Sequence, residues 1–237
     1  MTTAAPPTFG LDITPYGDSA LLVRAAPGSR ERRWRTVQRL ADAVQSDAVP
    51  GVRDLVATYD CLLVEFDCGR TDHDAVAGAV RRAATRVGDD GPVVPPRRFR
   101  IPVLYGGEHG PDLPEVADQL GLTADEVVRR HAGTEWVVRF LGAPVGAPML
   151  DGSPFPSSVS RCPRPRTRVP AGSVAVAGAQ AVIYPVASPG GWRLIGRTPL
   201  RLVDVARRPH VPYRPGDRFQ FVPVPEASWA EDAGELA

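Results

Sequence analysis

The feature that most restricts the fold of this 237-residue chain is an apolar, β-branched segment, residues 166–200. Glycine or proline interrupts the segment every few residues, and short runs of this kind are typical of strands in a compact β-barrel. Long helices are excluded here. We predict strands at 173–176, 181–184 and 193–195, and turns at 170–172, 178–179 and 188–191.

A few polar side chains stand within this otherwise apolar segment, and they mark it as the place for a pocket or a partner surface. They are Arg166, Arg168, Gln180, Tyr184, Arg193 and Arg197.

The charge balance removes several classes of function. The net charge is +1, so nothing in the composition favours a nucleic acid or an anionic membrane surface as a partner. Every basic residue is arginine. A lysine Schiff base, a phosphate-loop lysine and a lysine general base are therefore excluded.

The cysteines and the hydropathy pattern indicate the cellular compartment in which the protein is expected. Cys61, Cys68 and Cys162 lack the spacing of metal ligands, and no metal site is predicted. We find no apolar run of membrane-spanning length and no signal-peptide pattern. The expectation is a reduced, cytoplasmic protein.

The first part of the chain, residues 8–96, alternates between helical and strand patterns. A strand, a helix, two strands and a second helix are followed by a strand at 99–104, which is the order of a ferredoxin-like α+β domain. We expect the strands at 20–23, 52–58 and 62–66 and the second helix at 72–87.

Residues 97–134 read as a linking strand followed by two short helices. Thr123 and Glu126 fit a capping box at the start of the second helix, and Gly121 fits the end of the first. Residues 135–225 read as the barrel, which opens at 137–141 and ends at 217–222, and residues 226–237 read as a mobile tail.

Six pieces of the sequence, in order along most of the chain, resemble the 5-oxoprolinase B-subunit family, also called allophanate hydrolase subunit 1. The family includes Kip-type kinase inhibitors and part of the carboxyltransferase region of urea carboxylase. The resemblance implies a ferredoxin-like α+β domain followed by a cyclophilin-like β-barrel. The pieces are GDSALLV (17–23), IPVLYGGEHGPDLPEVA (101–117), RTRVPAGSV (166–174), AGAQ (177–180), IYP (183–185) and SPGGWRLIGRTPL (188–200).

Two residues are candidates for proton transfer, His131 and Glu108. The resemblance places His131 in a histidine-containing motif before the barrel, while its position at a helix end also suits a cap for the helix dipole. Glu108 lies in the Gly-Gly turn at 105–110, whose backbone amides are able to hold an anion. A purely structural turn is the alternative.

Four residues are candidates for substrate binding. Arg166 and Arg168 share one face of a strand, where two guanidinium groups suit a carboxylate; the alternative is a pair of structural salt bridges. Gln180 and Tyr184 are able to hydrogen-bond a substrate amide, although Tyr184 also fits a core position.

The loop at 140–150 departs from the family pattern. Ala143, Ala147 and Met149 stand where the family usually has aromatic residues, and Val182 stands where it has glycine. If this loop lines the pocket, Ala147 and Met149 enlarge it and make it more apolar.

Three functions follow from the resemblance and its departures. The first is the B-like component of an ATP-dependent 5-oxoprolinase, which opens a cyclic amide together with a C-subunit-like (KipA-like) partner and a possible A-subunit-like protein. The chain alone binds no cofactor in this hypothesis, and ATP enters with the complex. The second is a stand-alone cyclase, lyase or hydrolase of specialised metabolism that uses the altered pocket. The third is a Kip-type inhibitor of a sensor histidine kinase.

Overall fold

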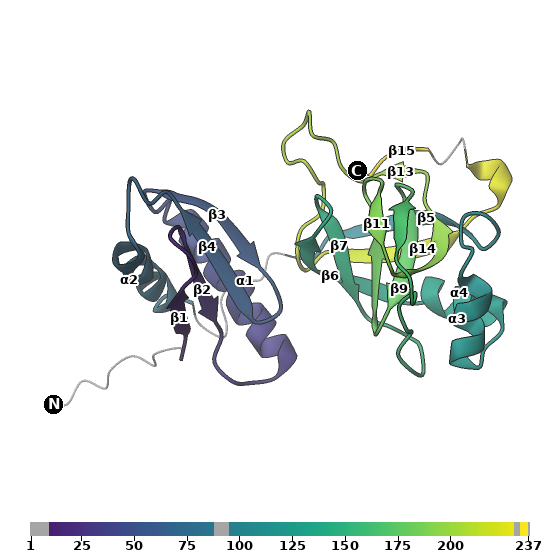
Figure 1. The fold of residues 1–237 in the computed structure, drawn as a ribbon, viewed down its shortest axis with the longest axis horizontal. Helices are drawn as coiled ribbons and strands as arrows, with labels where there is room; N and C mark the ends of the chain where they lie inside the picture. The colour runs from purple at the N-terminus through teal and green to yellow at the C-terminus, as the bar shows by residue number, and fades with distance from the viewer. Residues whose placement is uncertain (1–9, 88–94, 230–232, 237) are drawn as a thin grey trace. The chain divides into compact units, whose positions relative to one another are not determined.

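The computed structural model describes residues 10–87, 95–229 and 233–236. The chain divides into two compact units, with the division between residues 94 and 95 (Figure 1). Each unit has its own apolar core.

The first unit is a four-stranded antiparallel sheet with two helices, and the strand order is β1-β2-β4-β3. Leu21 and Val23 of β2 and Leu62 and Val64 of β4 are buried, whereas the intervening Leu22 and Leu63 are only partly buried, so both pairs face the same side. The helices bury their apolar faces against that side. The elements are β1 (Asp12–Pro15), β2 (Ala20–Arg24), α1 (Arg30–Ser46), β3 (Val52–Ala57), β4 (Cys61–Phe66) and α2 (His73–Ala84).

The ferredoxin-like expectation is wrong in its last strand. Residues 99–104 belong to β5 (Arg98–Tyr105), which pairs with β12 and β14 in the barrel. The place beside β2 is taken instead by β1, which is joined to β2 by a tight turn in which Tyr16 N donates to Ala20 O at 2.8 Å. A hairpin partner so close in sequence costs little loop entropy, which favours this pairing.

The second unit contains a closed barrel with the strand order β10-β7-β6-β14-β5-β12-β9. The β14–β5 pair is parallel and the other neighbours are antiparallel (Figure 1). Its elements are β5, α3 (Leu113–Leu120), α4 (Ala124–Ala132), β6 (Glu135–Gly142), β7 (Ala147–Asp151), β8 (Arg166–Val169), β9 (Ser173–Ala177), β10 (Gln180–Ile183), β11 (Ser188–Gly190), β12 (Arg193–Arg197), β13 (Leu200–Arg201), β14 (Arg218–Pro223), η1 (Glu226–Ser228) and β15 (Gly234–Glu235).

The predicted strands at 173–176, 181–184 and 193–195 are confirmed as β9, β10 and β12. The barrel does not open at 137–141, because β5 already belongs to it and lies between β12 and β14. Strands β8 and β11 pair with one another in a separate two-stranded sheet. The turn predicted at 188–191 is therefore wrong, because most of it is strand β11. Strand β11 and the arginines of β8 lie outside the barrel wall.

The segment expected to be a mobile tail carries regular structure. Residues 226–228 form one turn of 3-10 helix, and β15 pairs in parallel with β13. Leu236 is buried in the barrel core cluster, which explains why this end of the chain packs down.

Helices α3 and α4 begin and end where the sequence predicted. Gly121 ends α3 in the left-handed conformation, with φ 65°, and Thr123 begins α4 with a complete capping box. Val116 of α3 and Val127 of α4 are buried in the barrel core cluster, so both helices pack against the barrel.

Replacing Thr123 with alanine is expected to lower the free energy of unfolding by about 1 kcal/mol. The Thr123 hydroxyl accepts from Glu126 N at 3.2 Å, and the Glu126 carboxylate accepts from Thr123 N at 3.1 Å, so both bonds are lost or weakened together. Urea unfolding measures the change. Thr167→Ala, on exposed β8, is the control, and equal small effects in both variants would contradict the cap.

No helix among the described residues combines the length and the apolar character needed to cross a bilayer.

Candidate functional site

Three cavities stand out on the described part of the barrel unit. The largest, about 580 Å³, runs between α4 and β14 and includes Arg129 and Phe221 in its lining. A cavity of about 420 Å³ is lined by Asp112, Cys162, Pro163, Arg164, Arg166 and Arg193 and is called the arginine cavity below. A cavity of about 200 Å³ is lined by Glu108, His109, Pro170, Ser173, Leu194 and Arg197 and is called the histidine cavity.

The Gly-Gly turn at 105–110 connects both smaller cavities to β12. Gly106 N donates to Ile195 O at 3.1 Å, and Gly110 N donates to Gly106 O at 2.8 Å. These two amides are thus used within the fold, which reduces the number left for the anion site expected at this turn. The main role of the turn is to place Glu108 and His109 beside one cavity and Asp112 beside the other.

Replacing Gly110 with alanine is expected to destabilise the barrel unit by about 2 kcal/mol. A Cβ atom there would lie 2.1 Å from the backbone oxygen of Ile195, and a backbone contact has little room to yield. Denaturant unfolding with Gly234→Ala as the comparison checks this, because a Cβ at Gly234 meets nothing within 4 Å and its φ is not left-handed. A larger loss from Gly234→Ala would contradict the steric account.

Asp112 organises the arginine cavity. This residue is the N-cap of α3, and its side chain is almost fully buried. Its carboxylate accepts from Arg166 Nη2 at 2.7 Å and from the backbone amide of Leu194 at 2.7 Å. The hydrogen bond with Asp112 raises the pKa of the Arg166 guanidinium. One carboxylate therefore fixes β8, α3 and β12 around the cavity.

The arginine cavity carries an excess of positive charge. Arg193 is 5% exposed, and its guanidinium donates to Glu115 at 2.5 Å and to Ser160 O at 3.1 Å. Arg166 is matched by Asp112, whereas Arg164 forms no ion pair with any residue that the structure describes. Guanidinium groups bind carboxylates through paired hydrogen bonds, so this cavity suits a small anion.

The other arginine expected at the site lies elsewhere. Arg168 is exposed on β8 and does not line the arginine cavity, whereas Arg166 does. Residues two apart on a strand face the same side, so strand alternation alone does not distinguish Arg166 from Arg168. The two side chains differ because Arg166 donates a hydrogen bond to the buried carboxylate of Asp112.

Gln180 and Tyr184 contact other parts of the fold and do not line any of the three cavities. Gln180 Nε2 lies 3.4 Å from Asp151 Oδ1. Tyr184 is buried, and burial raises the pKa of its hydroxyl. Gly190 passes so close that a Cβ there would meet the Tyr184 hydroxyl at 2.3 Å.

Ala147 and Met149 lie in a packed cluster and line none of these three cavities. Ala147 is fully buried, and Met149 packs against the same cluster. Larger neighbours fill the volume that an aromatic residue at 147 would need. The buried members of the cluster are Ala147, Val169, Ala175, Val182, Tyr184 and Leu194.

His131 lies in the barrel core. Its side chain is fully buried, its Nδ1 is 2.7 Å from the Tyr105 hydroxyl, and its Nε2 has no partner among the described residues. The Phe221 and Trp136 rings lie 4.4 and 5.0 Å away. Burial lowers the pKa of His131 to about 3, so the ring is neutral at physiological pH. It contacts none of the three cavities, which argues against proton transfer to a substrate there.

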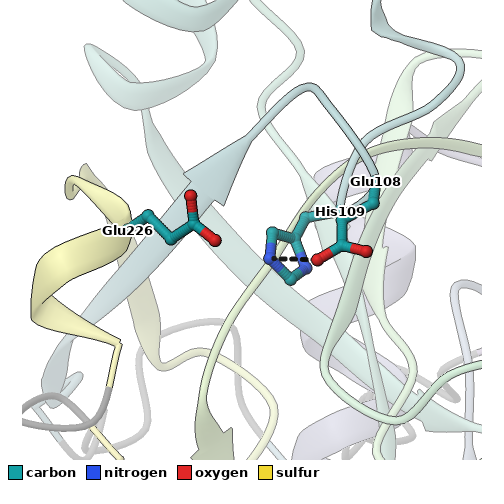
Figure 2. A group of neighbouring side chains, drawn as sticks. All are labelled: Glu108, His109 and Glu226. Carbon is teal, nitrogen blue, oxygen red and sulfur yellow. Dashed lines mark ion pairs between the residues drawn. The ribbon is translucent and has the colours of Figure 1, made fainter.

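Glu108 has a highly exposed side chain at the mouth of the histidine cavity, beside His109 and Glu226 (Figure 2). Sequence reasoning did not find Glu226, because it lies in the presumed tail. Asp112 and Arg164 were also missed as site residues, although Asp112 directly precedes a Leu-Pro helix start and so carried an N-cap signal.

Comparisons with known proteins agree on the relationship. Residues 11–213 match the family model for the carboxyltransferase domain, subdomain C and D. The 5-oxoprolinase B-subunit of Escherichia coli O157:H7 is 38% identical over 216 residues, which cover 89% of this chain and 94% of that protein. The structure of TTHA0988 is 36% identical with a TM-score of 0.73; the match covers 87% of this chain but only 40% of that one.

The urea carboxylase of Kluyveromyces lactis has the same fold, with a TM-score of 0.75 and 20% identity. The match covers 93% of this chain and 22% of that one, and at this identity it supports the fold alone.

Proposed function

Because the chain belongs to the 5-oxoprolinase B-subunit family of carboxyltransferase-domain proteins, we propose that it is the B-like component of an ATP-dependent 5-oxoprolinase complex. In this complex it works with a C-subunit-like protein and an A-subunit-like protein. The reaction opens the lactam ring of 5-oxoproline by hydrolysis.

The observation that carries the proposal is the arginine cavity. 5-oxoproline is a small lactam with one ionised carboxylate, and the cavity of about 420 Å³ lies in the size range of small-molecule sites. Arg164 is the guanidinium left without an internal counterion there, among the residues that the structure describes. We assign it the substrate carboxylate, with Arg166 and Arg193 held beside it by Asp112 and Glu115.

The carboxylates of Asp112 and Glu115 hold the arginine side chains of the cavity in position before a ligand binds. Asp112 and Glu115 both come from the start of α3, and each orients one arginine before any ligand arrives. Preorganised donors lose little entropy when they bind, which favours an anion over water. The chain has no phosphate-binding loop motif in its sequence, so nucleotide chemistry is assigned to the partners.

The packing favours this function over a repurposed stand-alone enzyme. That hypothesis requires a ligand-sized pocket lined by Ala143, Ala147, Met149 and Val182. The last three belong to or pack against a buried apolar cluster, and Ala143 is exposed. The arginine cavity, in contrast, is lined by four charged side chains, Asp112, Arg164, Arg166 and Arg193.

Reconstitution tests the proposal. The chain is assayed for 5-oxoproline-dependent ATP hydrolysis alone, with either partner, and with the A-subunit-like and C-subunit-like proteins together. We expect turnover only in the full mixture. Absence of turnover in a mixture that assembles, with a control set of the three proteins active, would refute the proposed function.

A further inference from the structure

The histidine cavity opens onto three side chains that meet from distant parts of the chain. His109 lies between the carboxylates of Glu108 and Glu226 (Figure 2). One ligand atom from each residue lies within 4.8 Å of the others. The His109 ring stacks on Trp229, with centroids 5.0 Å apart and planes 11° from parallel. The imidazole is therefore held in place, while the two carboxylates remain adjustable.

The negative charge of this group is not balanced within the described chain. The one ion-pair contact there is between Glu108 Oε1 and His109 Nε2, at 3.6 Å, and it requires a protonated ring. Arg197 lines the same cavity, but it donates to Ala171 O at 2.8 Å and lies over Trp229, and among the described residues it pairs with neither carboxylate. Two carboxylates that converge on one imidazole are favoured when a cation joins them.

Another polar residue borders the same cavity. Ser173 is nearly buried and lines the histidine cavity. Its hydroxyl is able to donate to, or accept from, an oxygen of a ligand held there, such as a metal-bound water.

We propose that Glu108, His109 and Glu226 bind a divalent transition-metal ion of the Zn²⁺ class. One imidazole and two carboxylates form a three-ligand set that leaves a fourth position open, which would face the cavity. Tetrahedral ligands on Zn²⁺ lie about 3.4 Å apart, so the two exposed carboxylates need to close by about 1 Å. Glu108 is then a metal ligand and not the general base expected from the sequence.

Binding would also connect parts of the fold. Glu226 begins the single turn η1, and Glu108 and His109 belong to the turn at 105–110. The metal would fasten the C-terminal segment over the histidine cavity. The residues of this site and those of the arginine cavity do not overlap, so the proposal is independent of the function assigned above.

Zinc titration of the full-length, EDTA-treated chain tests the site, with calorimetry for affinity and stoichiometry. Co²⁺ serves as a second probe, because it should quench Trp229 through the stacked His109 ring. We expect one ion per chain. His109→Phe keeps a ring against Trp229 but removes the ligand, and it should weaken Zn²⁺ binding by about 100-fold or more. Glu226→Gln should weaken it by at least about tenfold.

Two controls separate this site from other zinc ligands. His210→Phe removes an exposed histidine, and Cys68→Ser removes the exposed thiol; both should leave the affinity within about twofold. Equal affinity in wild type and His109→Phe would overturn the proposal. Loss of binding in the Cys68→Ser variant, or a wild-type dissociation constant weaker than about 1 mM, would overturn it as well.

Discussion

Replacing Arg164 with methionine is expected to lower kcat/KM for 5-oxoproline about 10- to 100-fold in the assembled complex. Arg164 is exposed at the rim of the arginine cavity. Loss of a hydrogen bond to a charged group costs about 1.5–3 kcal/mol, and each 1.36 kcal/mol is tenfold in rate. Arg164 has no ion pair within the described chain, so its removal leaves no internal carboxylate without a partner. Steady-state ATP hydrolysis as a function of 5-oxoproline concentration provides the measurement.

Arg168→Met is the matched control for this prediction. Arg168 is exposed and lies outside the arginine cavity, so kcat/KM should stay within about threefold of wild type. Arg166→Met should also lose activity, but it leaves the nearly buried Asp112 carboxylate without its partner and so lowers stability too. An unchanged Arg164→Met enzyme, or equal losses in the Arg164 and Arg168 variants, would reject the assignment.

The barrel unit is expected to lose about 3 kcal/mol of stability between pH 6.5 and pH 4 through His131 alone. Burial places the pKa of His131 at about 3 in the folded chain, against 6.5 for an unburied histidine. Between these values the unfolded chain binds a proton at His131 and the folded chain does not. Stability from this group is therefore complete above pH 6.5 and is lost as the pH falls towards 3.

Denaturant unfolding at a series of pH values isolates this effect when wild type is compared with His131→Gln. Glutamine does not titrate, but it retains an acceptor for the Tyr105 hydroxyl. A Trp34→Phe background confines the fluorescence signal to the barrel unit. His210→Gln should keep the wild-type pH dependence. Parallel curves for wild type and His131→Gln would contradict the burial argument.

The predictions from sequence succeeded where the determining interactions are local. Strands β9 and β10 meet across the turn at Gly178, and the capping box of α4 involves residues three apart in sequence. Strand β5 was found as a strand but assigned to the wrong sheet, because its barrel partners β12 and β14 lie far along the chain. A local sequence pattern predicts that a strand is buried, but it does not predict which strands lie beside it.

The site shows the same limit. Arg166 was predicted as a binding residue, but its partner Asp112 lies 54 residues earlier, and Glu115 lies 78 residues from Arg193. Arg166 and Arg193 each have an acidic partner within the chain, whereas Arg164 has none among the described residues. A local sequence pattern cannot predict which arginine lacks a partner. The charge available to a ligand is thus a property of the fold.

The expected pocket around Ala147 illustrates the opposite error. The small residue at 147 suggested vacated volume, yet Val169, Tyr184 and Leu194 belong to the same buried cluster and pack with it. Interiors are packed to a nearly constant density, so a smaller residue at one position is commonly offset by its neighbours. The C-terminal segment was predicted to be a mobile tail, but Leu236 within it is buried in the barrel core cluster.

The most direct test of the account is the equilibrium binding of 5-oxoproline and of 2-pyrrolidone, the same lactam without a carboxylate, to the assembled complex. If the arginine cavity holds the carboxylate, 5-oxoproline should bind about 10- to 100-fold more tightly than 2-pyrrolidone, and Arg164→Met should remove most of that difference. Equal binding of the two lactams, or a difference that survives in Arg164→Met, would contradict the central claim.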